Sequence, residues 1–140
     1  LESVRKKAEF IEQTARHLEL GHVTVRCERS ETSAHHAAYR ERAAAVTARA
    51  VAAMPVLCEL ALPFLKHKGV LLAFKTHSTL AQELTACETA LKTLGGVKHS
   101  VQAVTVKSLE NHCIAIIQKT GLCPDQFPRP AGRVQKKPLL

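Results

Sequence analysis

Residues 69–75 (GVLLAFK) constrain the fold more than any other segment of the chain. The stretch between Gly69 and Lys75 is apolar without interruption, whereas a strand with one wet face would alternate apolar and polar residues. A run this short is typical of a strand buried on both faces of a parallel sheet, with helices covering it. The sequence therefore predicts an α/β fold.

Three segments have the pattern of helices. Apolar residues recur at four-then-three spacing in two of them, and each of these ends at a glycine, the usual residue after a helix C-terminus. Pro55 fits the first turn of the third helix, and Pro63 is expected to bend or end it. Thr79 and Gln82 have the spacing of a capping box. The predicted helices span residues 4–18, 55–66 and 80–94.

β-Branched and apolar runs predict the strands that alternate with these helices. The alanines of residues 44–51 would also suit a helix, so this strand has the weakest pattern. The order of elements predicts a mostly parallel sheet with a C-terminal antiparallel hairpin. The predicted strands span residues 23–28, 44–51, 69–75, 100–106 and 113–118.

Composition limits the environment and the partners of the chain. With 140 residues, 46% of them hydrophobic, the chain is large enough for one core, and its formal charge of +8 favours a polyanionic partner. The five cysteines are odd in number and form no zinc-ligand pattern, so we expect reduced thiols, with Cys58, Cys87 and Cys113 in the core. No window reads as an export signal or membrane span, which, with the reduced thiols, favours a cytoplasmic protein. Because the Cys and His residues form no ligand pattern, no metal is expected.

The composition changes after Lys119. Residues 1–119 are expected to form the folded domain, and residues 120–140 a tail rich in Gly, Pro and basic residues. Its second half carries four cations that suit RNA phosphates, although a solvated terminus is the alternative. These cations are Arg129, Arg133, Lys136 and Lys137.

Several phrases, in this order, resemble the RsmG (also called GidB) family of ribosomal RNA guanine-N7 methyltransferases. They are LES, EFIE, ERSE, VTARAVAAMPVLCELALPFLK, GVLLAFK and FPRPAGRVQKKPL. The resemblance implies a partial class I (Rossmann-like) fold, dependent on S-adenosylmethionine, whose glycine-rich loop and first two strands would lie upstream of Leu1. Strand 23–28 would then have no neighbour, and strand 44–51 would have an unpaired edge.

The resemblance also implies a site at the carboxyl ends of the strands. Glu2, Ser30, Glu31 and Arg49 match family positions that hold the cofactor, while Arg29 and Lys75 match positions expected to face the RNA. Glu2 could instead be an acid at a helix N-terminus, and Arg49 or Lys75 an ordinary surface cation.

The implied reaction is methyl transfer to N7 of a guanine in small-subunit ribosomal RNA, free or in the assembling subunit. Guanine N7 already has an exposed lone pair, so no general base is needed and catalysis would consist mainly of positioning. The alternative is a non-catalytic, basic RNA-binding fragment.

Overall fold

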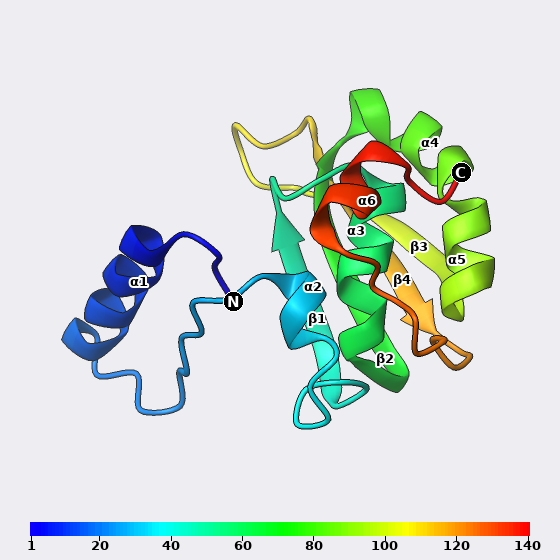
Figure 1. Cartoon of the computed structure of the whole chain (residues 1–140). Coiled ribbons are helices and arrows are strands. Elements are labelled where there is room, and N and C mark those ends of the chain that lie inside the picture. The colour runs from blue at the N-terminus through cyan, green and yellow to red at the C-terminus, as the bar shows by residue number, and fades with distance from the viewer.

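The computed structural model describes residues 1–140, apart from the side chain of His99. A four-stranded sheet in the order β1-β2-β4-β3 forms its centre (Figure 1). β1 and β2 are parallel, while β4 is antiparallel to both β2 and β3, so three strands run in one direction. The expected α/β class, with a partial Rossmann-like sheet and a C-terminal hairpin, is confirmed. The strands are β1 (Ala43–Arg49), β2 (Leu65–Thr76), β3 (Gly96–Ala103) and β4 (His112–Lys119).

Helices α3, α4 and α5 pack together on one face of the sheet (Figure 1). Leu71, Ala73, Ala115 and Ile117 point into this layer and are fully buried. The helices are α1 (Arg5–His17), α2 (Ser30–Ser33), α3 (Met54–Ala61), α4 (His77–Ala86), α5 (Glu88–Leu94) and α6 (Ala131–Lys136), with a 3-10 turn η1 (Leu62–Phe64).

The opposite face of β2 is not covered. Val70 and Leu72 are half-buried, and Phe74 is 39% exposed. The expectation that residues 69–75 are buried on both faces is therefore wrong for this chain. Its apolar run was consistent with two covered faces, but α3, α4 and α5 all pack on the same face.

Residues 23–28 do not form the expected strand. Their one sheet-like contact is an isolated parallel bridge between Glu2 and Cys27. β-Branched residues favour a strand only where a neighbour is available, and β1, at the edge of the sheet, is not that neighbour. The unpaired edge expected for residues 44–51 is present on β1.

Helix ends differ from the sequence patterns in two places. Thr79 and Gln82 do not begin a helix, because α4 already begins at His77, and the predicted helix 80–94 is interrupted at Cys87. The helix that begins near Pro55 ends at Ala61, well before Lys66, and passes through η1 into β2. Gly95 does cap α5, in a left-handed conformation with φ of 72°.

α1 lies apart from the sheet, at the left of Figure 1. Ala8 and Ala15 on this helix are buried, whereas Phe10 and Ile11 are 69% and 42% exposed, so much of its apolar surface is uncovered. Within the described residues, no helix is both long and apolar enough to cross a bilayer.

The C-terminal residues pack on the domain rather than extending into solvent. Cys123, Phe127, Pro128 and Val134 are buried, and α6 lies against α3 (Figure 1). A solvated terminus, the alternative considered for residues 120–140, is therefore excluded. All five cysteines are free thiols, and Cys58, Cys87 and Cys113 are in the core as predicted.

Candidate functional site

A polar pocket of about 480 Å³ lies at the C-terminal end of β1. Residues 1–3, residues 28–31, the turn 49–52 after β1, Lys7 of α1, Leu60 of α3 and Gln135 of α6 line it. Ligands of open α/β sheets bind at the carboxyl ends of the strands. The position of the pocket is therefore the one at which such a fold binds a small molecule.

The pocket brings together residues that are far apart in the sequence. Glu2, Ser30, Glu31 and Arg49, the four residues expected to contact the cofactor, all line it, and so does Arg29. Because α1 and the connection after it separate Glu2 from Ser30, their proximity is a property of the tertiary structure. The bridge between Glu2 and Cys27 produces it.

Glu2 is fixed by both its main chain and its side chain. Its N–H donates to the Arg26 carbonyl, its carbonyl accepts from the Glu28 N–H, and its Oε1 accepts from the Val4 N–H at 2.8 Å. The hydrogen bond from Val4 is the main reason that the pKa of Glu2 lies below its ordinary value. Oε2 has no hydrogen-bond donor in the described part of the chain, so it is open to a ligand.

Glu31 lies in the first turn of α2 and is 9% exposed. Arg29 donates from a terminal guanidinium nitrogen to its Oε1 at 3.1 Å, and about half of the Arg29 side chain remains exposed. Arg29 therefore orients the Glu31 carboxylate and still presents positive charge to solvent beside the pocket.

Arg49 is the last residue of β1, and its side chain is exposed. Ala50, which follows it, has φ of 54°, a left-handed conformation that costs a residue with a Cβ about 1 kcal/mol. This turn leads residues 50–52 around the pocket. Among the described residues Arg49 has no ion-pair partner, so its guanidinium is free to bind a ligand.

Lys75 does not face the crevice, which corrects the expectation that it contacts RNA. Its Nζ donates to the Ala52 carbonyl at 2.7 Å and to Glu83 Oε2 at 2.6 Å, and its side chain is only 12% exposed. Glu83 Oε2 also accepts from the Met54 N–H. Lys75 therefore supports the turn that borders the pocket and ties it to α4.

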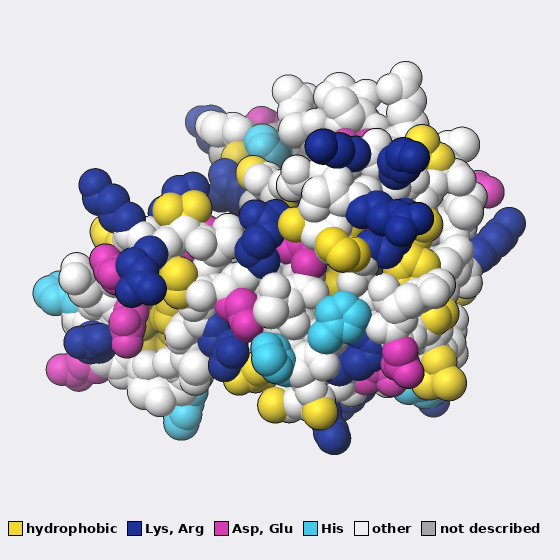
Figure 2. Space-filling model, in the orientation of Figure 1, with side chains coloured by type: hydrophobic (Ala, Val, Ile, Leu, Met, Phe, Trp, Pro, Cys, Tyr) yellow, Lys and Arg dark blue, Asp and Glu magenta, His cyan; other side chains and the backbone are white. Residues whose placement is uncertain are grey.

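The four tail cations have different surroundings. Arg129 is bound to the fully buried Glu59 of α3, so its charge is compensated inside the protein instead of being presented to RNA as expected. Arg133, Lys136 and Lys137 are exposed. Lys and Arg side chains are spread over the face drawn in Figure 2, with acidic side chains between them, so the positive charge does not form one uniform patch.

Two residues that line the pocket, Lys7 and Gln135, were not predicted from the sequence. The basic helix that follows Glu2 was the available signal for Lys7, which helps to lower the pKa of Glu2. Gln135 had no signal, since its place depends on how the tail packs. Among the described side chains, no group of three His, Cys, Asp or Glu residues could hold a metal ion.

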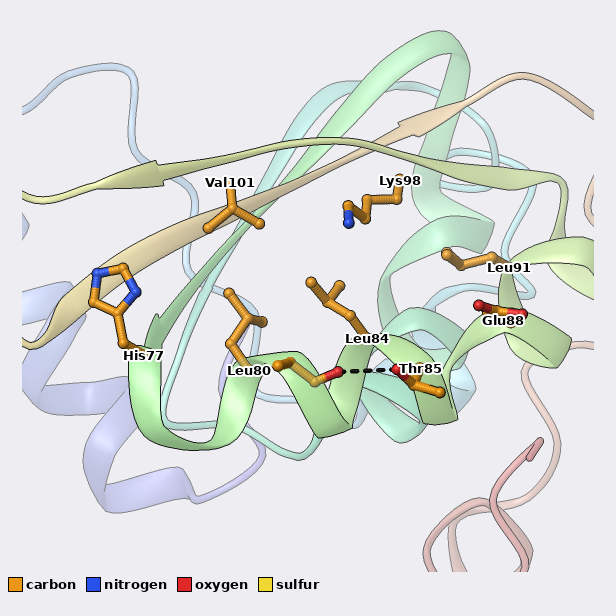
Figure 3. A pocket seen from close by; sticks show the side chains of 9 residues that line it. His77, Leu80, Leu84, Thr85, Glu88, Leu91, Lys98 and Val101 are labelled. Atoms are coloured by element: carbon orange, nitrogen blue, oxygen red, sulfur yellow. Dashed lines mark hydrogen bonds between the residues drawn. The ribbon is translucent and has the colours of Figure 1, made fainter.

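A second groove, of about 510 Å³, lies between α4, α5 and β3 (Figure 3). Leu80, Leu84 and Val101 point into it, with Lys98 and Glu88 also on its walls (Figure 3). None of the residues expected to bind cofactor or RNA lines this groove. The pocket at the end of β1 is therefore the candidate functional site.

Comparisons with known proteins show the family of the chain. Residues 1–114 match the family model GidB, described as rRNA small subunit methyltransferase G. Proteins named ribosomal RNA small subunit methyltransferase G from Deinococcus deserti, Geobacillus kaustophilus and Chloroflexus aggregans are 39%, 39% and 40% identical over 99–100% of the chain. The chain spans 57–58% of the length of these relatives. It therefore belongs to the GidB family of small-subunit rRNA methyltransferases.

Proposed function

We propose that this chain works as the C-terminal part of an enzyme that transfers a methyl group from S-adenosylmethionine to N7 of a guanine in small-subunit ribosomal RNA. The name of its relatives supports the class of RNA. The methyl donor, the N7 position and action in the cytoplasm are parts of the proposal that rest on the sequence resemblance.

One observation carries the proposal. Glu2, Ser30, Glu31 and Arg49 converge on a single pocket at the carboxyl end of β1. If these residues had been matched to the family by chance, nothing would require the fold to bring them together. Their convergence supports a common ligand.

The residues fit the methyl donor. The pocket volume of about 480 Å³ is in the range of small-molecule sites. The open Oε2 of Glu2 can accept a hydrogen bond from a ribose hydroxyl, and the main chain of Ser30 and Glu31, which line the same pocket, can bind the edge of an adenine. When bound, S-adenosylmethionine supplies an activated methyl group. The protein has to hold that methyl group near the acceptor nitrogen.

The reaction requires the protein to orient the methyl donor and the guanine, and it requires no proton transfer by a side chain. Guanine N7 attacks with a lone pair that carries no proton, so no side chain has to act as a base. Arg49 can donate to guanine O6 and fix the plane of the base, which contributes to the rate through proximity. Arg29, Arg133, Lys136 and Lys137 are exposed cations that can bind the flanking phosphates.

A chimera tests the proposed activity directly. The N-terminal part of the Geobacillus kaustophilus relative is fused before residue 1, and transfer of tritiated methyl groups to protein-free small-subunit rRNA is measured. Chemical cleavage at N7-methylguanine identifies the product. We expect transfer by the chimera and loss of most activity in Arg49→Ala. Arg42→Ala, an exposed arginine outside the pocket, is the matched control. If Arg49→Ala and Arg42→Ala are equally active, Arg49 has no role in the site.

A second candidate function is RNA binding without catalysis. The formal charge of +8 and the exposed cations of α6 favour it. It predicts RNA binding by the chain that weakens steeply with salt, together with a chimera that transfers no methyl group. Methyl transfer by the chimera would reject this candidate.

A further inference from the structure

The C-terminal residues are held on the domain by side chains that are distant in sequence. Arg40 donates to the carbonyls of Cys123, Pro124 and Phe127 at 2.9, 3.0 and 2.7 Å. Such a set of charge-assisted hydrogen bonds fixes the path of the main chain. The tail therefore approaches α3 along a defined route.

Arg129 then fixes α6 itself. Its main-chain N–H and its Nε each donate to Glu59 Oε1 at 2.8 Å, and one terminal nitrogen donates to Glu59 Oε2 at 2.6 Å. The same terminal nitrogen donates to the carbonyl of Lys137, which follows α6. One guanidinium thus ties the residues on both sides of this short helix to a buried carboxylate of α3. Hydrogen bonds to Glu59 raise the pKa of Arg129 above its ordinary value.

This anchoring determines which α6 side chain meets the pocket. Val134 is fully buried, while Gln135, the next residue, lines the pocket with the turn 49–52 and Leu60. Most of the polar lining is charged, with three carboxylates and three cations from other segments. Gln135 adds a neutral amide, which can both donate and accept hydrogen bonds.

We propose that Gln135 contacts the substrate nucleotide and that the Arg129–Glu59 pair is the device that positions it; this rests on the proposed function. A neutral amide suits the edge of a base, on which donors and acceptors lie side by side, better than a phosphate. Arg133 and Lys136 on the same helix are exposed and suit the phosphates on either side. α6 is therefore the wall of the pocket that faces the RNA.

Equilibrium binding by the chimera that carries the Geobacillus kaustophilus N-terminal part tests the role of Gln135. The probes are a protein-free small-subunit rRNA transcript and, separately, S-adenosylhomocysteine. We expect Gln135→Ala to weaken RNA binding by about 5-fold, the value of a typical hydrogen bond, and to leave S-adenosylhomocysteine binding unchanged. Gln126→Ala is the matched control, because Gln126 is an exposed tail glutamine outside the pocket. Equal RNA affinity of the two variants would overturn the proposal.

A double-mutant cycle tests the positioning role of Arg129. Arg129→Lys keeps the positive charge but cannot reach both Glu59 oxygens and the Lys137 carbonyl together. If Arg129 acts through Gln135, Arg129→Lys weakens RNA binding, and adding Gln135→Ala weakens it no further. Additive losses would show that Arg129 acts independently and would overturn this part.

The same measurements separate this inference from the function on which it rests. A wild-type chimera that binds RNA, combined with a Gln135→Ala variant of unchanged RNA affinity, rejects the inference and leaves the proposed function standing. A wild-type chimera that binds neither probe and transfers no methyl group rejects both.

Discussion

Replacing Arg129 by alanine should destabilise the domain strongly. Glu59 is fully buried on α3, and two of its three hydrogen bonds come from the Arg129 side chain, at 2.8 and 2.6 Å. In Arg129→Ala the carboxylate stays buried and keeps only the main-chain N–H of residue 129. A buried charge without its partner is among the more costly defects that a single substitution can produce.

The expected size follows from these contacts. Each lost hydrogen bond to a charged group contributes about 1.5–3 kcal/mol, and removing one partner of a buried ion pair costs about 3–5 kcal/mol in total. A domain of this length has a free energy of unfolding of roughly 7–20 kcal/mol, at about 0.05–0.15 kcal/mol per residue. We therefore expect Arg129→Ala to lose about 3–5 kcal/mol, a substantial part of the stability.

Urea unfolding followed by circular dichroism measures this loss. Arg133→Ala is the matched control, because Arg133 lies on α6 with an exposed side chain, and it should stay within about 0.5 kcal/mol of wild type. The double variant Arg129→Met with Glu59→Met should regain much of the loss, since an apolar pair leaves no buried charge. An Arg129→Ala variant as stable as Arg133→Ala would refute the reasoning.

Three further predictions concern other parts of the chain. Lys119→Met should lower the free energy of unfolding, measured in urea, by about 3 kcal/mol. The reason is that Glu41 and the carbonyls of Leu62 and Leu65 lose a buried donor. A loss smaller than that of an exposed-lysine control such as Lys98→Met would contradict this. Burial raises the pKa of Glu41, but hydrogen bonds, the one from Lys119 foremost, lower it more, so it lies below 4.5. Ionised Glu41 contributes its full stabilisation above pH 4.5, and this contribution is lost as the pH falls through the lowered pKa of the folded state. Glu41→Gln should therefore reduce the dependence of the free energy of unfolding on pH at low pH. An unchanged dependence would contradict a stabilising Glu41–Lys119 ion pair. An aromatic disulfide reagent should modify one thiol of the folded chain, Cys27, and all five in denaturant, whereas rapid reaction of a second thiol would show that the others are not buried.

The sequence by itself determined the order of most helices and strands. Periodicity is a local property: the stripe of α1, the apolar run of β2 and the glycine that caps α5 each depend on neighbours within a few residues. The resemblance to a family also predicted one site for Glu2 and Arg49, and both residues line the same pocket. Local patterns could not, however, decide whether residues 23–28 would find a strand to pair with.

Only the tertiary structure decided what the individual charges do. Lys75 and Arg129 look like surface cations in the sequence, yet each is compensated by a glutamate on another element, Glu83 on α4 and Glu59 on α3. The place of Gln135 in the pocket likewise depends on the docking of the tail. The physical reason is that burial and ion pairing are set by groups brought together across the fold, and their separation along the chain carries no local signal.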